Sequence, residues 1–377
     1  MKLRRARPAS VMLFLFLCLF LTFLFPLCSS AEDATKEKIL TDVTEDIRLE
    51  GTDFNFYEKA EAVLNGEAIV GSERVVFSIF NMFFSMLKEN FHLLTKIAAL
   101  CIFSGVLGAI TGEDTSQLGF LVCLVLITSM AINVLKNVLL SAETTIDNLL
   151  IFMQSLIPSV SMLSAGAENA FSISFHPALF AAMQTVIYTC KHWFLPMILF
   201  VSVLSVINSM TARFHITKLL ETCRLFIKWG LGLLMTIYVA LLGIQGFSGA
   251  MQAGALSKTA KYAIGTFIPM VGSVLAESAE SVLASIYLIR NAVGIAGMIA
   301  ILSLTASPIL NILSTSVIFR LAASLSEPVA DKRITKLISD LAGSVSLIFS
   351  ILLAVSAMFM ISIAMLLSIT NIPQMMR

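Results

Sequence analysis

Uncharged apolar stretches dominate the chain from residue 97 onward, and short polar segments separate them. About twenty apolar residues in a helix cross the hydrocarbon layer of a bilayer, so each stretch of this kind predicts a transmembrane helix. Pro177–Cys190 is too short to span on its own. We expect an all-α fold, a polytopic transmembrane helix bundle, with six spans: Ile97–Gly112, Thr115–Leu135, Trp193–Ala212, Trp229–Ser257, Asn291–Phe319 and Leu341–Met376.

The N-terminal pattern differs from these stretches. Four basic residues precede a short apolar core and the small residues Ser29, Ser30 and Ala31, which predicts a cleaved signal peptide over residues 1–31. An uncleaved signal anchor is the alternative. Residues 32–90 follow as an acid-rich extracytoplasmic segment, and its last part, Arg74 to Lys88, reads as an amphipathic helix at the membrane surface.

Two segments are too polar to span and too apolar to be ordinary loops, Ser141–Phe171 and Ser257–Arg290. We interpret both as interrupted or re-entrant helices, because irregular backbone at membrane depth is tolerated only inside protein or beside water. An interfacial helix with a solvated face is the alternative. The candidate polar-lining or helix-break positions are Pro158, Glu168, Lys258, Lys261, Pro269, Gly272, Glu277 and Glu280.

An internal duplication relates these two segments. Ile157-Pro158 and Ile268-Pro269 match at an offset of 111 residues, and Pro196 matches Pro308 at 112. The sequence ITKLL from Ile216 matches ITKLI from Ile334 at 118. Three landmarks in one order predict a first hairpin (residues 91–140), a repeat 1 (141–256) and a repeat 2 (257–377), unless short apolar motifs recur by chance. Matching interrupted helices are typical of transporters and channels, although hairpins that only pack would give the same pattern.

Basic residues gather at two elbows between spans, near Lys218 and near Lys336. The positive-inside rule places both elbows in the cytoplasm, so the two repeats would run in the same direction. Within repeat 2, Gly294 and Gly297 would let neighbouring helices approach closely.

Composition excludes several classes of function. The chain is 58% hydrophobic and 13% charged, with a formal net charge of +1, so lipid is its main solvent and it is no general nucleic-acid binder. The four histidines lack metal-ligand spacing, and Cys101, Cys123, Cys190 and Cys223 lie in or beside apolar runs as small core residues. No phosphate-binding loop, HExxH or GxSxG motif occurs. We expect no enzymatic activity, no catalytic residue, no cofactor and no metal.

Several longer segments resemble the stage III sporulation protein AE family of endospore-forming bacteria. The resemblance is carried by LSKTAKYAIGTFIPMVGSVLAESAESV, LIRNAVGIAGMIAIL and FRLAASLSEPVADKRITKLISDL, with SLIPSVSMLSAG and FHPALF ahead of them in the family's order. It covers nearly the whole chain after the leader. The residue ahead of the Glu327-Pro328 pair departs from the aliphatic residue we expect there.

The resemblance implies a multi-pass sporulation protein in the mother-cell membrane that surrounds the forespore. Its partners would be the other products of the stage III A operon, including an ATPase and ring-forming subunits, and a forespore-side stage II partner. The assembly would act as a secretion-like channel that supports late forespore gene expression. Two alternatives remain open: a non-conducting membrane scaffold for that complex, and a stand-alone secondary transporter.

Overall fold

The computed structural model describes residues 72–110, 113–165, 170–210, 216–267 and 272–375. Near most helix ends only the backbone is described. All regular structure in the described residues is helical. The elements are α4 (Ser72–Ile110), α5 (Glu113–Ala165), α6 (Ala170–Thr189), the π-helix η1 (Cys190–Phe194), α7 (Leu195–Met210), α8 (Thr217–Phe267), α9 (Gly272–Ser326) and α10 (Lys332–Met375).

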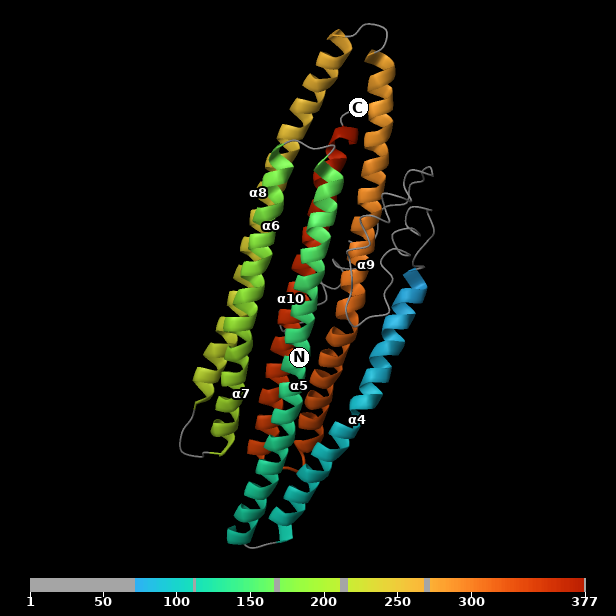
Figure 1. The fold of residues 1–377 in the computed structure, drawn as a ribbon. Coiled ribbons are helices and arrows are strands. Elements are labelled where there is room, and N and C mark those ends of the chain that lie inside the picture. Colours follow the sequence, from blue (N-terminus) through green and yellow to red (C-terminus); the bar gives the residue numbers. More distant parts are fainter. Residues whose placement is uncertain (1–71, 111–112, 166–169, 211–215, 268–271, 376–377) are drawn as a thin grey trace, which may run out of the picture.

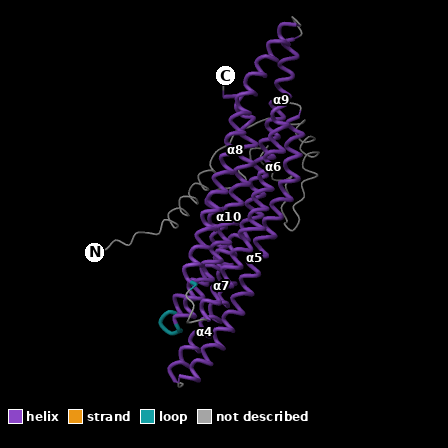
Figure 2. Tube along the Cα trace, turned by 90° about the vertical axis from the view of Figure 1, so that its left-hand side faces the viewer, coloured by secondary structure: helices purple, strands orange, loops and turns teal. Residues whose placement is uncertain are grey.

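The helices form one elongated bundle in which neighbours along the chain run in opposite directions (Figures 1 and 2). α4 descends in Figure 1, α5 rises, and α6, η1 and α7 descend as one rod. α8 then rises, α9 descends and α10 rises. The signal peptide and the acid-rich segment predicted for the N-terminus lie outside the described residues, apart from the part of that segment that belongs to α4.

The helix α10 lies at the centre of the bundle, in contact with α5, α6, α7, α8 and α9. Sequence explains this position, because Leu341–Met376 carries no charge. Its side chains Ile348, Leu352, Val355 and Met358 are completely buried among the surrounding helices. A helix that is apolar on every face is covered either by lipid or by other helices, and for α10 the burial of these side chains shows that helices cover it. The middle of the described bundle is therefore filled by packed side chains.

Six described helical segments are long and apolar enough to cross a membrane, and each overlaps one of the six spans expected from the sequence. Two of the segments that the sequence analysis names belong to longer helical elements. Pro177–Cys190 is not a separate element, because α6 continues through η1 into α7. The segment from Arg74 to Lys88 forms the first part of α4, and its position at the membrane surface stays a prediction.

The π-helix η1 explains how the rod passes Pro196. Proline has no backbone N–H, so it cannot complete an ordinary helical turn. The chain widens just before it, and the Leu195 N–H donates to the Cys190 carbonyl, five residues back. A π-turn of this kind keeps the helix axis continuous, and α6 and α7 thus behave as one membrane-spanning rod.

The first of these segments, Ser141–Phe171, is helical without a break as far as Ala165. α5 runs from Glu113 to Ala165 and contains Pro158 in its interior. The exposed proline faces outward, while Leu156, Ile157 and Val160 beside it are buried. Packing on this inner face compensates for the backbone hydrogen bond that proline removes. A helix break at Pro158, as the sequence suggested, is therefore not seen.

The second segment coincides with a helix boundary. α8 ends at Phe267 and α9 begins at Gly272, and Pro269 between them lies outside the described residues. The two prolines thus lie differently: Pro158 is inside α5, whereas Pro269 falls between the end of α8 and the start of α9. The duplication that the sequence suggests is not tested by this difference and stays a prediction.

Candidate functional site

The two basic elbows meet at one end of the bundle. Thr217 is the first residue of α8, and Lys336 lies in the first turn and a half of α10. The Lys336 Nζ donates to the Thr217 Oγ1 over 3.0 Å. The elbows therefore lie at the same end of the bundle, and α8 and α10 start there side by side and run parallel, as the charge pattern predicted.

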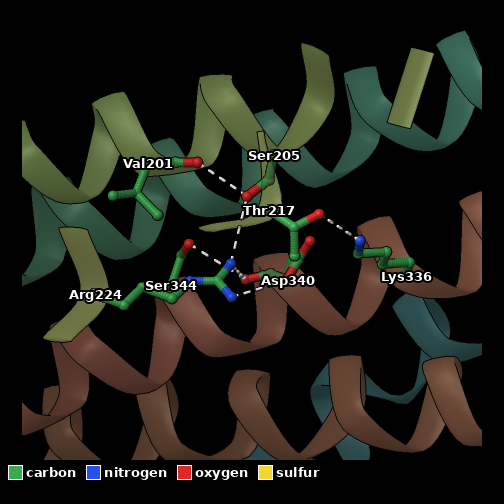
Figure 3. A network of polar contacts seen from close by, with 7 residues as sticks. All are labelled: Val201, Ser205, Thr217, Arg224, Lys336, Asp340 and Ser344. Atoms are coloured by element: carbon green, nitrogen blue, oxygen red, sulfur yellow. Dashed lines mark hydrogen bonds and ion pairs between the residues drawn. The ribbon is translucent and has the colours of Figure 1, made fainter. Parts of the chain in front are cut away.

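Two turns further along these helices, an ion pair joins α8 to α10 (Figure 3). The Arg224 Nη1 lies 2.8 Å from the Asp340 Oδ1, and Nη2 donates to the backbone carbonyl of Asp340 over 2.9 Å. The side chains are only 21% and 16% exposed, respectively. The guanidinium thus donates to the carboxylate and to the backbone carbonyl of Asp340 at the same time. A lysine ammonium lacks the planar, forked donors that this geometry requires.

Serines from two helices complete this polar network. Ser205 of α7 donates to the Val201 carbonyl over 2.9 Å and accepts a 3.4 Å hydrogen bond from the Arg224 Nη2. Ser344 donates to the Asp340 carbonyl over 3.4 Å. The guanidinium lies beside Gly343, where a Cβ would be 3.7 Å from the Arg224 Cζ, an ordinary van der Waals contact. The network ties α7, α8 and α10 together.

The physical role of this network follows from its surroundings. Charges removed from water are costly unless paired and hydrogen-bonded, and removing one partner of a buried pair costs about 3–5 kcal/mol. Arg224 comes from the elbow of repeat 1 and Asp340 from the elbow of repeat 2, as the sequence divides the chain. The pair therefore fixes how far α8 is shifted along α10. In the predicted duplication, α8 and α10 would be corresponding helices of the two repeats.

Further polar contacts join the helices higher in the bundle. Lys191 of η1 contacts both carboxylate oxygens of Asp147 on α5, at 2.7 and 2.9 Å. Tyr238 of α8 shares a short hydrogen bond with Ser362 of α10. The buried Arg290 of α9 donates from Nη2 to the Leu366 carbonyl over 2.7 Å. These contacts position helices, and no group of three potential metal ligands converges among the described side chains.

The eight candidate polar-lining or helix-break positions do not lie together in the structure. Lys258 and Lys261 lie near the end of α8, and Gly272, Glu277 and Glu280 lie at the start of α9. These five residues lie where α8 ends and α9 begins, at the end of the bundle opposite the elbows (Figure 1). The side chains of this region are not described. Pro158 lies apart on α5, and Glu168 and Pro269 are outside the described residues. Their lining role stays a prediction.

Sequence reasoning missed the pairing of Arg224 with Asp340. From the sequence alone, Arg224 is one of the basic residues of the elbow near Lys218, and Asp340 only precedes the uncharged span Leu341–Met376. One signal was present: each charge lies a few residues after one of the matching ITKLL and ITKLI motifs and shortly before a long apolar run. Opposite charges in such corresponding places are candidates for pairing, because an unpaired charge there would be costly.

The fold and the network define an all-α, multi-pass membrane protein whose helices are tied together by polar contacts. Comparison with known proteins gives the family. The family model described as stage III sporulation protein AE matches residues 54–370, so the chain belongs to that family. The chain is also 26% identical over 319 residues to the stage III sporulation protein AE of Bacillus subtilis (strain 168), covering 83% of this chain and 80% of that protein. No solved structure matches it.

Proposed function

We propose that this sporulation membrane protein is a wall-forming, multi-pass component of a channel complex between mother cell and forespore, needed for late forespore gene expression. Family membership supports the sporulation role. The observation that bears on mechanism is the central helix α10, whose Leu352, Val355 and Met358 fill the axis of the described bundle. A conduit would then run between several chains and not through one.

In this proposal the chain is no enzyme and holds no cofactor. Energy would come from the separate ATPase subunit, and the ring-forming subunits and the forespore-side stage II partner would extend the conduit across the intermembrane space. The protein would lie in the mother-cell membrane around the forespore, with its N-terminal segment outside the mother-cell cytoplasm. The filled axis does not favour a stand-alone secondary transporter, which would need a binding site at the centre of its own bundle.

Reconstitution distinguishes a channel subunit from a scaffold. The purified assembly is placed in a planar bilayer with and without this chain, and conductance is measured. We expect the conducting path to disappear without the chain. If conductance persists while the rings or the ATPase detach, the chain is a non-conducting scaffold.

A cell-based measurement tests the sporulation role separately. A strain that lacks the chain should form engulfed forespores with little activity of a late forespore reporter, and the wild-type chain should restore that activity. Normal reporter activity without the chain would contradict the proposed role.

A further inference from the structure

The outward face of α5 changes from apolar to polar along the helix. From Leu118 to Leu126 every exposed residue is aliphatic. Beyond them the outward residues are mostly polar, although Ile132, Leu140 and Ile151 are exposed among them. The polar residues follow one another at helical spacing and so share one side of the helix. We call six of them the α5 polar face: Asn133, Lys136, Asn137, Thr144, Asn148 and Gln154.

The α5 polar face is as long as a bilayer is thick. From Asn133 to Gln154 the helix advances twenty-one residues, or about 32 Å, and the hydrocarbon layer measures about 30 Å. The opposite side of the same helix is buried against its neighbours, with Leu135, Leu149 and Phe152 almost inaccessible. α5 is therefore amphipathic, and its polar side points away from the bundle.

The contact between α5 and α10 shows which part of α5 lies beside uncharged helix. The Arg333 guanidinium, in the first turn of α10, lies 5.6 Å above the Phe120 ring. Both helices rise from there (Figure 1). The uncharged part of α10 begins at Leu341, eight residues after Arg333, and it is about level with Thr128, eight residues after Phe120. A bilayer around the uncharged part of α10 therefore surrounds the α5 polar face.

A second set of contacts gives the height of this face relative to α8. Lys191 of η1 lies 2.7 Å from the Asp147 carboxylate of α5. Three residues further along the same rod, the ring of Phe194 lies 3.1 Å from the place that a Cβ on Gly230 would occupy. Asp147 and Gly230 are therefore within about one turn of the same height, and α5 and α8 both rise from it (Figure 1).

At this height the outer side of α8 is apolar. The span Trp229–Ser257 carries no charge, and its Leu233, Ile237 and Ile244 are exposed. The exposed charges of the described part of α8 all precede Trp229 and lie nearer the elbows. One level of the bundle thus has an apolar side on α8 and a polar side on α5.

α6 extends the polar side next to α5. Gln184, Thr185 and Tyr188 are exposed on α6, and the Lys191–Asp147 ion pair joins the two helices. The hydroxyl groups are satisfied locally: Thr144 donates to the Leu140 carbonyl, and Thr185 donates to the Ala181 carbonyl. The exposed amides and the Lys136 ammonium carry several donors each, which are stable in water and costly against acyl chains.

Exposed charges elsewhere do not form such a surface. On α4, Lys88 and Glu89 lie between the exposed rings of Phe84 and Phe91. On α9, Arg320 is exposed next to the exposed Leu321, near the elbow end. These helices mix charged and apolar side chains within a turn or two, whereas α5 and α6 together present an extended polar surface.

We propose that the α5 polar face lines the water of the conduit, while acyl chains cover the apolar side of α8. The inference rests on the proposed function, in which the conduit runs between several chains. Polar residues of membrane segments face a protein interior or a water-filled cavity. The interior of this bundle is filled by α10, so the water lies outside α5. Polar solutes in the conduit would then pass amides, hydroxyls and the Asp147–Lys191 pair.

Thiol accessibility in the conducting assembly tests this assignment. In a chain without its native cysteines, Asn137→Cys, Thr144→Cys and Asn148→Cys are compared with Leu233→Cys and Ile237→Cys, matched controls on α8. The assembly is placed in a planar bilayer, and a positively charged methanethiosulfonate is added. We expect the α5 cysteines to react several-fold faster than the α8 cysteines and their modification to reduce the conductance.

Every outcome of this experiment is decisive. If the α5 cysteines react no faster than the α8 cysteines, lipid or another protein covers the α5 polar face and the inference is wrong. Reaction that leaves the conductance unchanged also overturns it, because the water would not belong to the conduit. The proposed function is judged separately, by whether conductance requires the chain at all, so the lining of α5 can fail while the channel role stands.

The selectivity of the conduit provides an independent measurement. Asn148→Lys and Asn148→Glu place opposite charges on the α5 polar face, and the reversal potential is measured in a potassium chloride gradient. We expect the two variants to shift the reversal potential in opposite directions from the wild type, because a wall charge attracts ions of the other sign. Identical reversal potentials in assemblies that contain the variant chain would refute the assignment. Unchanged thermal unfolding in detergent shows that each variant is folded.

Discussion

At the scale of single residues, the Arg224–Asp340 pair is the contact with the clearest physical consequence. Its guanidinium meets both the carboxylate and the backbone carbonyl of Asp340 in a region with little access to water. Most other hydroxyl groups in the bundle form local contacts: Ser202, Thr305 and Ser356 each donate to the carbonyl four residues back. Such bonds satisfy a polar group inside its own helix, whereas the ion pair connects different helices.

Breaking this pair should destabilise the protein. Arg224→Gln and Asp340→Asn each leave one partly buried charge without its partner, and each should lower the free energy of unfolding by about 1–3 kcal/mol. The double variant should cost less than the sum of the two, because neither charge remains. Thermal unfolding in detergent gives this comparison.

A matched control is Lys218→Gln, because Lys218 is 94% exposed and lies 3.8 Å from Glu221. Exposed pairs contribute little, so this variant should unfold like the wild type. Strictly additive effects of the two network substitutions would show that Arg224 and Asp340 are not coupled.

At the scale of helices, close packing depends on small residues at particular heights. The sequence predicted that Gly294 and Gly297 allow close approach, and the structure confirms it. A Cβ on Gly294 would collide with the Leu367 side chain of α10, and one on Gly297 would lie 3.2 Å from Leu156 of α5. These glycines fit α9 against α5 and α10, which positions the central helix.

Enlarging Gly294 should separate α9 from α10. Gly294→Val introduces methyl groups where Leu367 already lies, and overpacking of this kind costs about 1–3 kcal/mol. Gly243→Val is the matched control, since nothing lies within 4 Å of a Cβ at that position of α8. Unfolding temperatures in detergent should fall for the first variant and not for the second. Equal effects would indicate that loss of glycine, and not the contact with Leu367, determines stability.

At the scale of the whole molecule, the alternation of helix directions relates the two ends of the chain. The six spans alternate, so the start of α4 and the end of α10 face the side opposite the elbows (Figure 1). Basic residues near both elbows favour the cytoplasm for that end. The C-terminus would then lie on the same side as the N-terminal segment.

Cysteine labelling in intact cells tests this topology. In a chain without its native cysteines, produced in non-sporulating cells, Lys218→Cys and Lys336→Cys should both be protected from a membrane-impermeant maleimide until the cells are permeabilised. The reason is that both residues lie at the elbow end, with Lys336 bonded to Thr217. A cysteine added after Arg377 should react without permeabilisation. Labelling of Lys218 and Lys336 from opposite sides would contradict the parallel arrangement of α8 and α10.

The sequence by itself determined the helical class, the six spans and the position of both basic elbows, because hydrophobic length and charge are local properties of a chain in a membrane. It also identified Gly294 and Gly297 as contact positions. Only the tertiary structure decided that α5 continues through Pro158, since packing of Leu156 and Ile157 on the inner face outweighs the local cost of a proline. It alone also decided that Arg224 meets Asp340, because residues 116 positions apart become partners only when α8 and α10 pack together.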